Sequence, residues 1–134
     1  AAFGQHSGVM TGPADLFQLP RFAINEKFGN ISRLKIILNS LPFSITDQTP
    51  REHLILKTNP PAIGFTLSQD MFNINKLQCF ISSEGSANLE RLGALRVEVR
   101  IRKPFPKGRT RMNCTLPGQN NRWHWFGRMF LKLK

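Results

Sequence analysis

In the last third of the chain, residues 94–102 alternate strictly between apolar and polar side chains, and residues 109–116 alternate again, with Met112, Cys114 and Leu116 on one parity. Successive side chains of a strand point to opposite faces of its sheet, so a period of two is typical of a strand with one buried face. A break rich in Pro, Lys and Gly, residues 103–108, separates the two segments. This part of the chain is therefore predicted to form two β-strands joined by a turn.

The chain before residue 94 is divided into short apolar runs by Gly, Pro, Asn and Ser. Residues 87–92 are predicted to form one short helix that ends at Gly93. The spacing of the runs predicts an all-β fold: a single-domain antiparallel β-sandwich, jelly roll or barrel of about seven to eight strands. The other runs expected to form strands are residues 21–28, 33–43, 51–58, 62–67, 76–82 and 122–134.

A chain of 134 residues has the length of one domain. Residues 1–20 are rich in Gly and Pro and show little periodicity, so they are predicted to form an extended or flexible N-terminal arm. Residues 21–134 are predicted to form the single β domain. No apolar run approaches the roughly 18 residues of a transmembrane helix, and residues 1–6 lack the charged and apolar regions of a signal peptide.

Charge is distributed very unevenly along the chain. The formal net charge is +11, and no acidic residue follows Glu98. Ten of the 19 Lys and Arg residues lie in residues 100–134, so about +10 of the net charge belongs to this segment. A field of one sign attracts polyanions and steers their approach, so the expected partner is a polyanion.

The alternation predicts which side chains of the last three strands share a face. One face is expected to enter the core: Leu95, Val97, Val99, Ile101, Met112, Cys114, Leu116, Trp123, Trp125, Met129, Leu131 and Leu133. The opposite face and the 103–107 break are expected to hold the nucleic-acid-binding residues: Arg96, Arg100, Arg102, Lys103, Lys107, Arg109, Arg111, Phe126, Arg128, Phe130 and Lys132.

Such a face would suit single-stranded nucleic acid. Same-face neighbours along a strand lie about 6.6–6.8 Å apart, an interval similar to that of phosphates along a single strand. Arg side chains bind phosphates in a bidentate manner, and exposed Phe126 and Phe130 would stack on bases. Phe105, between Lys103 and Lys107, could add a further stacking contact.

Three other interpretations remain open for this region. A basic face can simply be solvated and have no partner. Phe126 and Phe130 could instead be buried between two layers of the fold. A bulge at Gly127 would reverse the parity of one half of the last strand and bring Trp123 and Trp125 outside.

The two cysteines, Cys79 and Cys114, are either two buried thiols or one disulfide. Reduced thiols in an intracellular setting are favoured over an extracellular disulfide. If the two cysteines are bridged, closing a loop of about 36 residues would stabilise the fold by about 4 kcal/mol.

No catalytic or metal-binding motif is present: the chain lacks a Gly-rich phosphate loop, His-Glu-x-x-His, Gly-x-Ser-x-Gly and Cys-x-x-Cys. The three histidines, His6, His53 and His124, are far apart in sequence. Glu98, between Arg96 and Arg100, is explained better by an ion pair than by acid–base chemistry. The protein is therefore expected not to be an enzyme and to need no cofactor or metal.

The favoured function is that of a non-enzymatic polyanion-binding β domain that binds single-stranded nucleic acid. A coat or packaging protein that forms homo-oligomers is one version of this function. Two alternatives stay open. One is a matrix-like structural protein on an anionic membrane surface. The other is an extracellular β-sandwich that binds a sulfated glycan or a receptor.

Overall fold

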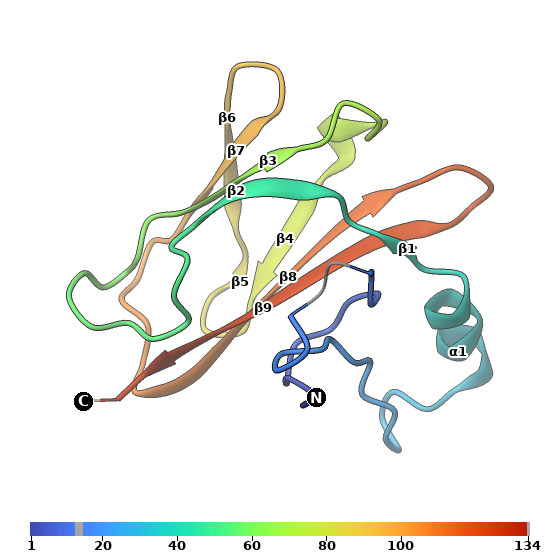
Figure 1. Cartoon of the computed structure of the whole chain (residues 1–134), viewed down its shortest axis with the longest axis horizontal. Coiled ribbons are helices and arrows are strands. Elements are labelled where there is room, and N and C mark those ends of the chain that lie inside the picture. Colours follow the sequence, from blue (N-terminus) through green and yellow to red (C-terminus); the bar gives the residue numbers. More distant parts are fainter. Residues whose placement is uncertain (13–14, 134) are drawn as a thin grey trace.

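The computed structural model describes residues 1–12 and 15–133 and consists mainly of two packed β-sheets (Figure 1). The five-stranded sheet has the order β1-β9-β8-β4-β5, and the four-stranded sheet has the order β2-β3-β7-β6. All strand pairs are antiparallel except β1 with β9. The strands are β1 (Leu41–Pro42), β2 (Ile45–Thr49), β3 (Ile63–Leu67), β4 (Gln78–Ile81), β5 (Gly85–Ser86), β6 (Asn88–Leu92), β7 (Arg96–Arg100), β8 (Gly108–Pro117) and β9 (Trp123–Lys132). The predicted all-β fold is confirmed.

The core lies between the two sheets and is built by the alternating strands. Val97 and Val99 of β7 are buried, as are Met112, Cys114 and Leu116 of β8. The alternation predicted for these two segments is therefore confirmed. The buried side chains of β3 complete this core from the neighbouring strand, and they are Ile63, Phe65 and Leu67.

The helix predicted at residues 87–92 is wrong. Residues 88–92 form β6, which pairs with β7 along its whole length. Gly93, with a φ of +81°, lies in the turn that joins β6 to β7 rather than at a helix end. Pairing with a strand that is already half-buried outweighed the weak local helix preference of this run.

The one α-helix among the described residues is α1 (Ile31–Leu38), which overlaps the strand predicted at residues 33–43. Asn30 caps it, because its side-chain oxygen accepts a hydrogen bond from the Arg33 amide at 2.8 Å. A short 3-10 helix, η1 (Ile74–Lys76), precedes β4. No helix in the described part of the chain is long and apolar enough to cross a membrane.

Cys79 and Cys114 form a disulfide that joins β4 to β8. They are directly opposite each other in the register, with their Cα atoms 4.0 Å apart, and both are buried. The preference for reduced thiols is therefore wrong. Sequence spacing could not decide this, because it carries no information on strand register.

The segment before α1 folds back onto β9 (Figure 1). Gly8 forms an isolated bridge with Phe126, and Leu19 is buried. Phe22 packs edge-on against Trp125, with ring centroids 5.2 Å apart. Residues 1–12 and 15–22, called here the N-terminal segment, thus cover part of the outer face of the five-stranded sheet; Pro13 and Ala14, within the predicted arm, lie outside the described residues.

Candidate polyanion-binding surface

The register of β8 with β9 decides which side chains of β9 face the core. Thr110 lies opposite Phe130, and Met112 lies opposite Arg128. Directly opposed residues share a face, so Phe130 and Arg128 point inward with the buried side chains of β8. The predicted parity of β9 is therefore wrong over the whole strand, and the pairing continues without a bulge at Gly127.

Burial removes three of the predicted aromatic contacts. Phe130 is fully buried, and Phe126 is half-buried and packs against the core. Phe105 is buried too, with its ring centroid 5.5 Å from that of Phe130. None of the three presents a ring face for a base. The open alternative, in which Phe126 and Phe130 fill the space between the layers, is the one found.

Arg128 makes contacts inside the fold and does not belong to the exposed basic surface. Its side chain is buried, and its Nη2 donates to the carbonyls of Pro50, Arg51 and Glu52. Its guanidinium carbon lies 5.2 Å from the Phe130 ring centroid. Burial lowers the pKa of Arg128, and the nearby charge of Glu52 opposes this change. Arg128 therefore connects the loop after β2 to β9.

Arg96 and Arg100 lie on β7, in the four-stranded sheet, and are paired with carboxylates. Arg96 contacts Glu98 at 2.8 Å, and Arg100 contacts Glu90 at 2.6 Å. The hydrogen bond that Arg100 Nε donates to the Glu90 carboxylate is the main cause that raises the pKa of Arg100. The expectation that they share one face with the arginines of β8 is wrong, because β7 and β8 belong to different sheets.

Six predicted cations remain at one end of the sandwich, where β7 leads into β8 and β9 finishes. We call this surface the basic end, and it consists of Arg102, Lys103, Lys107, Arg109, Arg111 and Lys132. Five of them are exposed and Lys132 is half-buried. In the described part of the chain, the ion pairs are those of Arg96 and Arg100, so no cation of the basic end is held by a carboxylate.

The turn between β4 and β5 connects the two halves of the basic end. Ser82 exchanges backbone and side-chain hydrogen bonds with Arg111 at 2.9 Å. Glu84 accepts the backbone amides of Arg102 and Lys103, each at 3.2 Å. The carboxylate of Glu84 is therefore directed at the backbone of the loop, while both cationic side chains remain exposed.

Two further segments border the basic end. Asn59 makes a reciprocal pair of hydrogen bonds with the backbone of Phe105, at 3.0 and 2.7 Å, which brings the loop between β2 and β3 to this end (Figure 1). On the other side, the side chain of Arg109 donates to Gln5 of the N-terminal segment. The basic end is therefore framed by a loop and by the N-terminal segment.

The structure adds an aromatic residue that the sequence interpretation missed. Phe80 on β4 is 53% exposed and lies opposite Asn113 of β8. It shares the outer face of the sheet with Arg111, which lies two residues from Asn113 along β8. The signal is present in the sequence, because Leu77, Cys79 and Ile81 alternate along residues 76–82 and share one face, which leaves Phe80 on the other.

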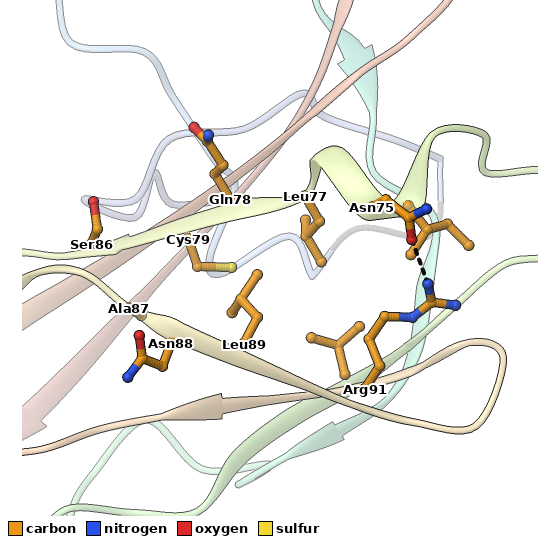
Figure 2. Close-up of a pocket in the computed structure, with 11 residues that line it drawn as sticks. Asn75, Leu77, Gln78, Cys79, Ser86, Ala87, Asn88, Leu89 and Arg91 are labelled. Atoms are coloured by element: carbon orange, nitrogen blue, oxygen red, sulfur yellow. Dashed lines mark hydrogen bonds between the residues drawn. The ribbon is translucent and has the colours of Figure 1, made fainter.

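A cleft of about 480 Å³ opens between β4 and β6, at the edge where the two sheets separate (Figure 2). Leu77 and Leu89 point into it, and Arg91 donates to Asn75 across it at 2.7 Å. No carboxylate or histidine is among its lining residues in the described part of the chain. The residues that line the cleft therefore provide no side chain suited to general acid–base chemistry.

A second hollow, of about 450 Å³, lies beneath the N-terminal segment and contains His6, His53 and Arg128. His53 Nδ1 is 2.7 Å from the carbonyl of Met129, so this nitrogen carries the proton. Burial, followed by the charges of His53 and Arg128, lowers the pKa of His6. No three His, Cys, Asp or Glu side chains among the described residues are grouped as metal ligands.

No protein-family model, curated protein or solved structure matches this chain.

Proposed function

We propose that this protein is a non-enzymatic β domain that binds a polyanion, with single-stranded nucleic acid as the favoured ligand, through the basic end and Phe80. The observation that carries the proposal is the group of six cations without carboxylate partners among the described residues. They lie beside a ring that is 53% exposed.

Each part of this surface has a chemical role in the proposal. Arg109 and Arg111 project from the same face of β8, about 6.6–6.8 Å apart along the strand, which suits successive phosphates. Their planar guanidinium groups bind phosphate oxygens in a bidentate manner. Phe80, on the adjacent strand, supplies a ring face on which one base can stack, a contact worth roughly 1–3 kcal/mol.

The proposal predicts a defined salt dependence. Each phosphate contact with a single strand removes about 0.7 from the slope of log affinity against log salt, so six contacts give a slope of about −4. Filter binding of single-stranded RNA, single-stranded DNA and heparin over a salt series would measure it.

Matched double variants test the location of the site. Arg109→Gln/Arg111→Gln should reduce the salt slope by about 1.4 and weaken binding. Arg100→Gln/Lys76→Gln removes the same charge from outside the basic end and should change both quantities less. Equal losses in the two variants would mean that net charge, rather than this surface, drives binding.

A sulfated glycan is the second candidate, and the Cys79–Cys114 disulfide favours it. Disulfides persist mainly in oxidising compartments, where sulfated glycans are the abundant polyanions. The exposed ring separates the two candidates: Phe80→Ala should weaken RNA binding and leave heparin binding unchanged. In a coat or packaging role, binding would be repeated over a homo-oligomer, which sedimentation velocity with and without RNA can detect.

A further inference from the structure

The outward face of α1 is apolar. Ile31 is 71% exposed, Leu34 39% and Leu38 74%, and no residue of the helix is buried. Positions i, i+3 and i+7 lie on one side of a helix, so these three side chains form a continuous stripe.

The inward face of α1 carries a charge instead. The guanidinium carbon of Arg33 lies 4.9 Å from the Phe28 ring centroid and 5.7 Å from a Trp125 ring centroid. A surface helix of a globular protein normally buries its apolar stripe and exposes its charges. In α1, Arg33 is turned inward while Ile31, Leu34 and Leu38 are exposed, so this apolar stripe does not serve the core of this chain and is available to a partner.

The tip of the β8–β9 hairpin lies beside α1. Arg122 Nε donates to the carbonyl of Asn39, directly after the helix, at 2.8 Å. Lys35, Arg122 and Trp123 line one hollow of about 430 Å³ between the helix and the tip. The apolar stripe is thus adjacent to two exposed cations and to a tryptophan that is 38% exposed.

The sequence around this surface contains no carboxylate to balance these cations. No Asp or Glu occurs in residues 27–46, which include α1, or in residues 99–134, which include the hairpin tip. A partner that buries the stripe must therefore also accept positive charge.

We propose that α1 and the β8–β9 tip bind the surface of an anionic lipid bilayer. Ile31, Leu34 and Leu38 would enter the boundary between headgroups and acyl chains, as the apolar face of an interfacial helix does. Trp123 would lie at headgroup level, and Lys35 and Arg122 would extend to anionic headgroups.

Charge favours this partner over a second copy of the chain. A two-fold dimer places the same patch on both sides of its interface. The cations Lys35 and Arg122 would then face an identical cationic patch, with no acidic side chain between the two. The bilayer surface is also separate from the basic end, since α1 and the end of β9 lie at opposite ends of the long axis (Figure 1).

Flotation of the full chain with phosphatidylcholine vesicles, with and without phosphatidylserine, tests the proposal. The wild-type protein should float with the anionic vesicles. Ile31→Ser/Leu38→Ser should reduce the bound fraction at least tenfold, whereas Leu56→Ser/Leu92→Ser, two leucines exposed elsewhere at 75% and 49%, should leave it unchanged. Lys35→Gln/Arg122→Gln should weaken binding about fivefold for each cation removed. Circular dichroism should confirm that each variant is folded.

Three results would overturn the proposal. The first is a wild-type protein that does not float with anionic vesicles. The second is flotation that is lost in Arg109→Gln/Arg111→Gln but kept in Ile31→Ser/Leu38→Ser, which would assign lipid to the basic end. The third is a wild-type dimer, seen by sedimentation velocity, that Ile31→Ser/Leu38→Ser dissociates without any change in flotation; the stripe would then bind a second copy.

Discussion

The backbone of Ser7 lies directly over Gly127 of β9, in the space that a side chain at position 127 would occupy. The Ser7 amide nitrogen is 2.7 Å from the position of a Cβ on Gly127, and the Ser7 carbonyl oxygen is closer still. Real Cβ atoms essentially never approach other atoms so closely. The absence of a side chain at this one position therefore lets the N-terminal segment cross the sheet.

Gly127→Ala should displace the N-terminal segment. The added methyl group must move the Ser7 backbone, at a cost of roughly 1–3 kcal/mol. Trypsin should then cleave at Arg21 faster than in the wild-type protein. Gly12→Ala is the matched control, because a Cβ there meets nothing within 4 Å. Cleavage at the wild-type rate in Gly127→Ala would contradict the close approach.

Acid should release the same segment. The pKa of His6 is lowered from its ordinary value of 6.5, first by burial and then by the charges of His53 and Arg128. Below pH 6.5 the released segment therefore binds more protons than the docked one, and docking weakens as the pH falls further. The protection factors of residues 2–8, which are the intrinsic exchange rates at each pH divided by the observed rates, should therefore fall over this range.

Asp15 also lines the hollow beneath the segment and would attract a proton to His6, but it does not outweigh the burial and the two basic groups. His6→Gln should remove most of the pH dependence of these protection factors, whereas His124→Gln should keep it. Protection factors in His6→Gln that still fall as in the wild-type protein would assign the effect to another group.

Two phenylalanines should respond in opposite ways to truncation. Phe130→Ala should destabilise the fold by about 3–5 kcal/mol, because the ring is fully buried. Phe80→Ala should change the free energy of unfolding by less than about 1 kcal/mol, since half of the ring is exposed, yet weaken binding of single-stranded RNA by about 1–3 kcal/mol. Urea denaturation and filter binding measure the two effects, and unaltered RNA affinity in Phe80→Ala would remove the stacking contact.

Loss of the disulfide should destabilise the fold. Cys79→Ala/Cys114→Ala opens a loop of about 36 residues, for which the chain-entropy relation gives about 4 kcal/mol. Urea denaturation of this variant and of the oxidised wild-type protein measures the difference. The intact mass of the wild-type protein should be about 2 Da below that of its reduced form; equal masses would contradict the bridge.

The sequence was most informative where polar and apolar side chains alternate without ambiguity. In residues 94–102 and 109–116 one parity is mainly apolar and the other is largely charged or polar. Only the apolar parity could therefore be buried, and the structure buries it. The same logic failed in residues 122–134. There both parities carry aromatic or aliphatic side chains, as Trp125 and Phe126 show. Either face could have been buried, and the pattern could not choose between them.

The sequence by itself determined the class of the fold, the inner faces of β7 and β8, and the excess of positive charge in the last third of the chain. Only the tertiary structure decided that Phe126, Arg128 and Phe130 of β9 face inward, because the choice depends on register with β8 and on the N-terminal segment that covers the other face. It also decided which cations lie together. Arg100 is paired with Glu90 in its own sheet, whereas Arg102 lies in the loop that leaves this sheet and its side chain has no carboxylate partner among the described residues. Charges act through space, so the sequence could not show this difference.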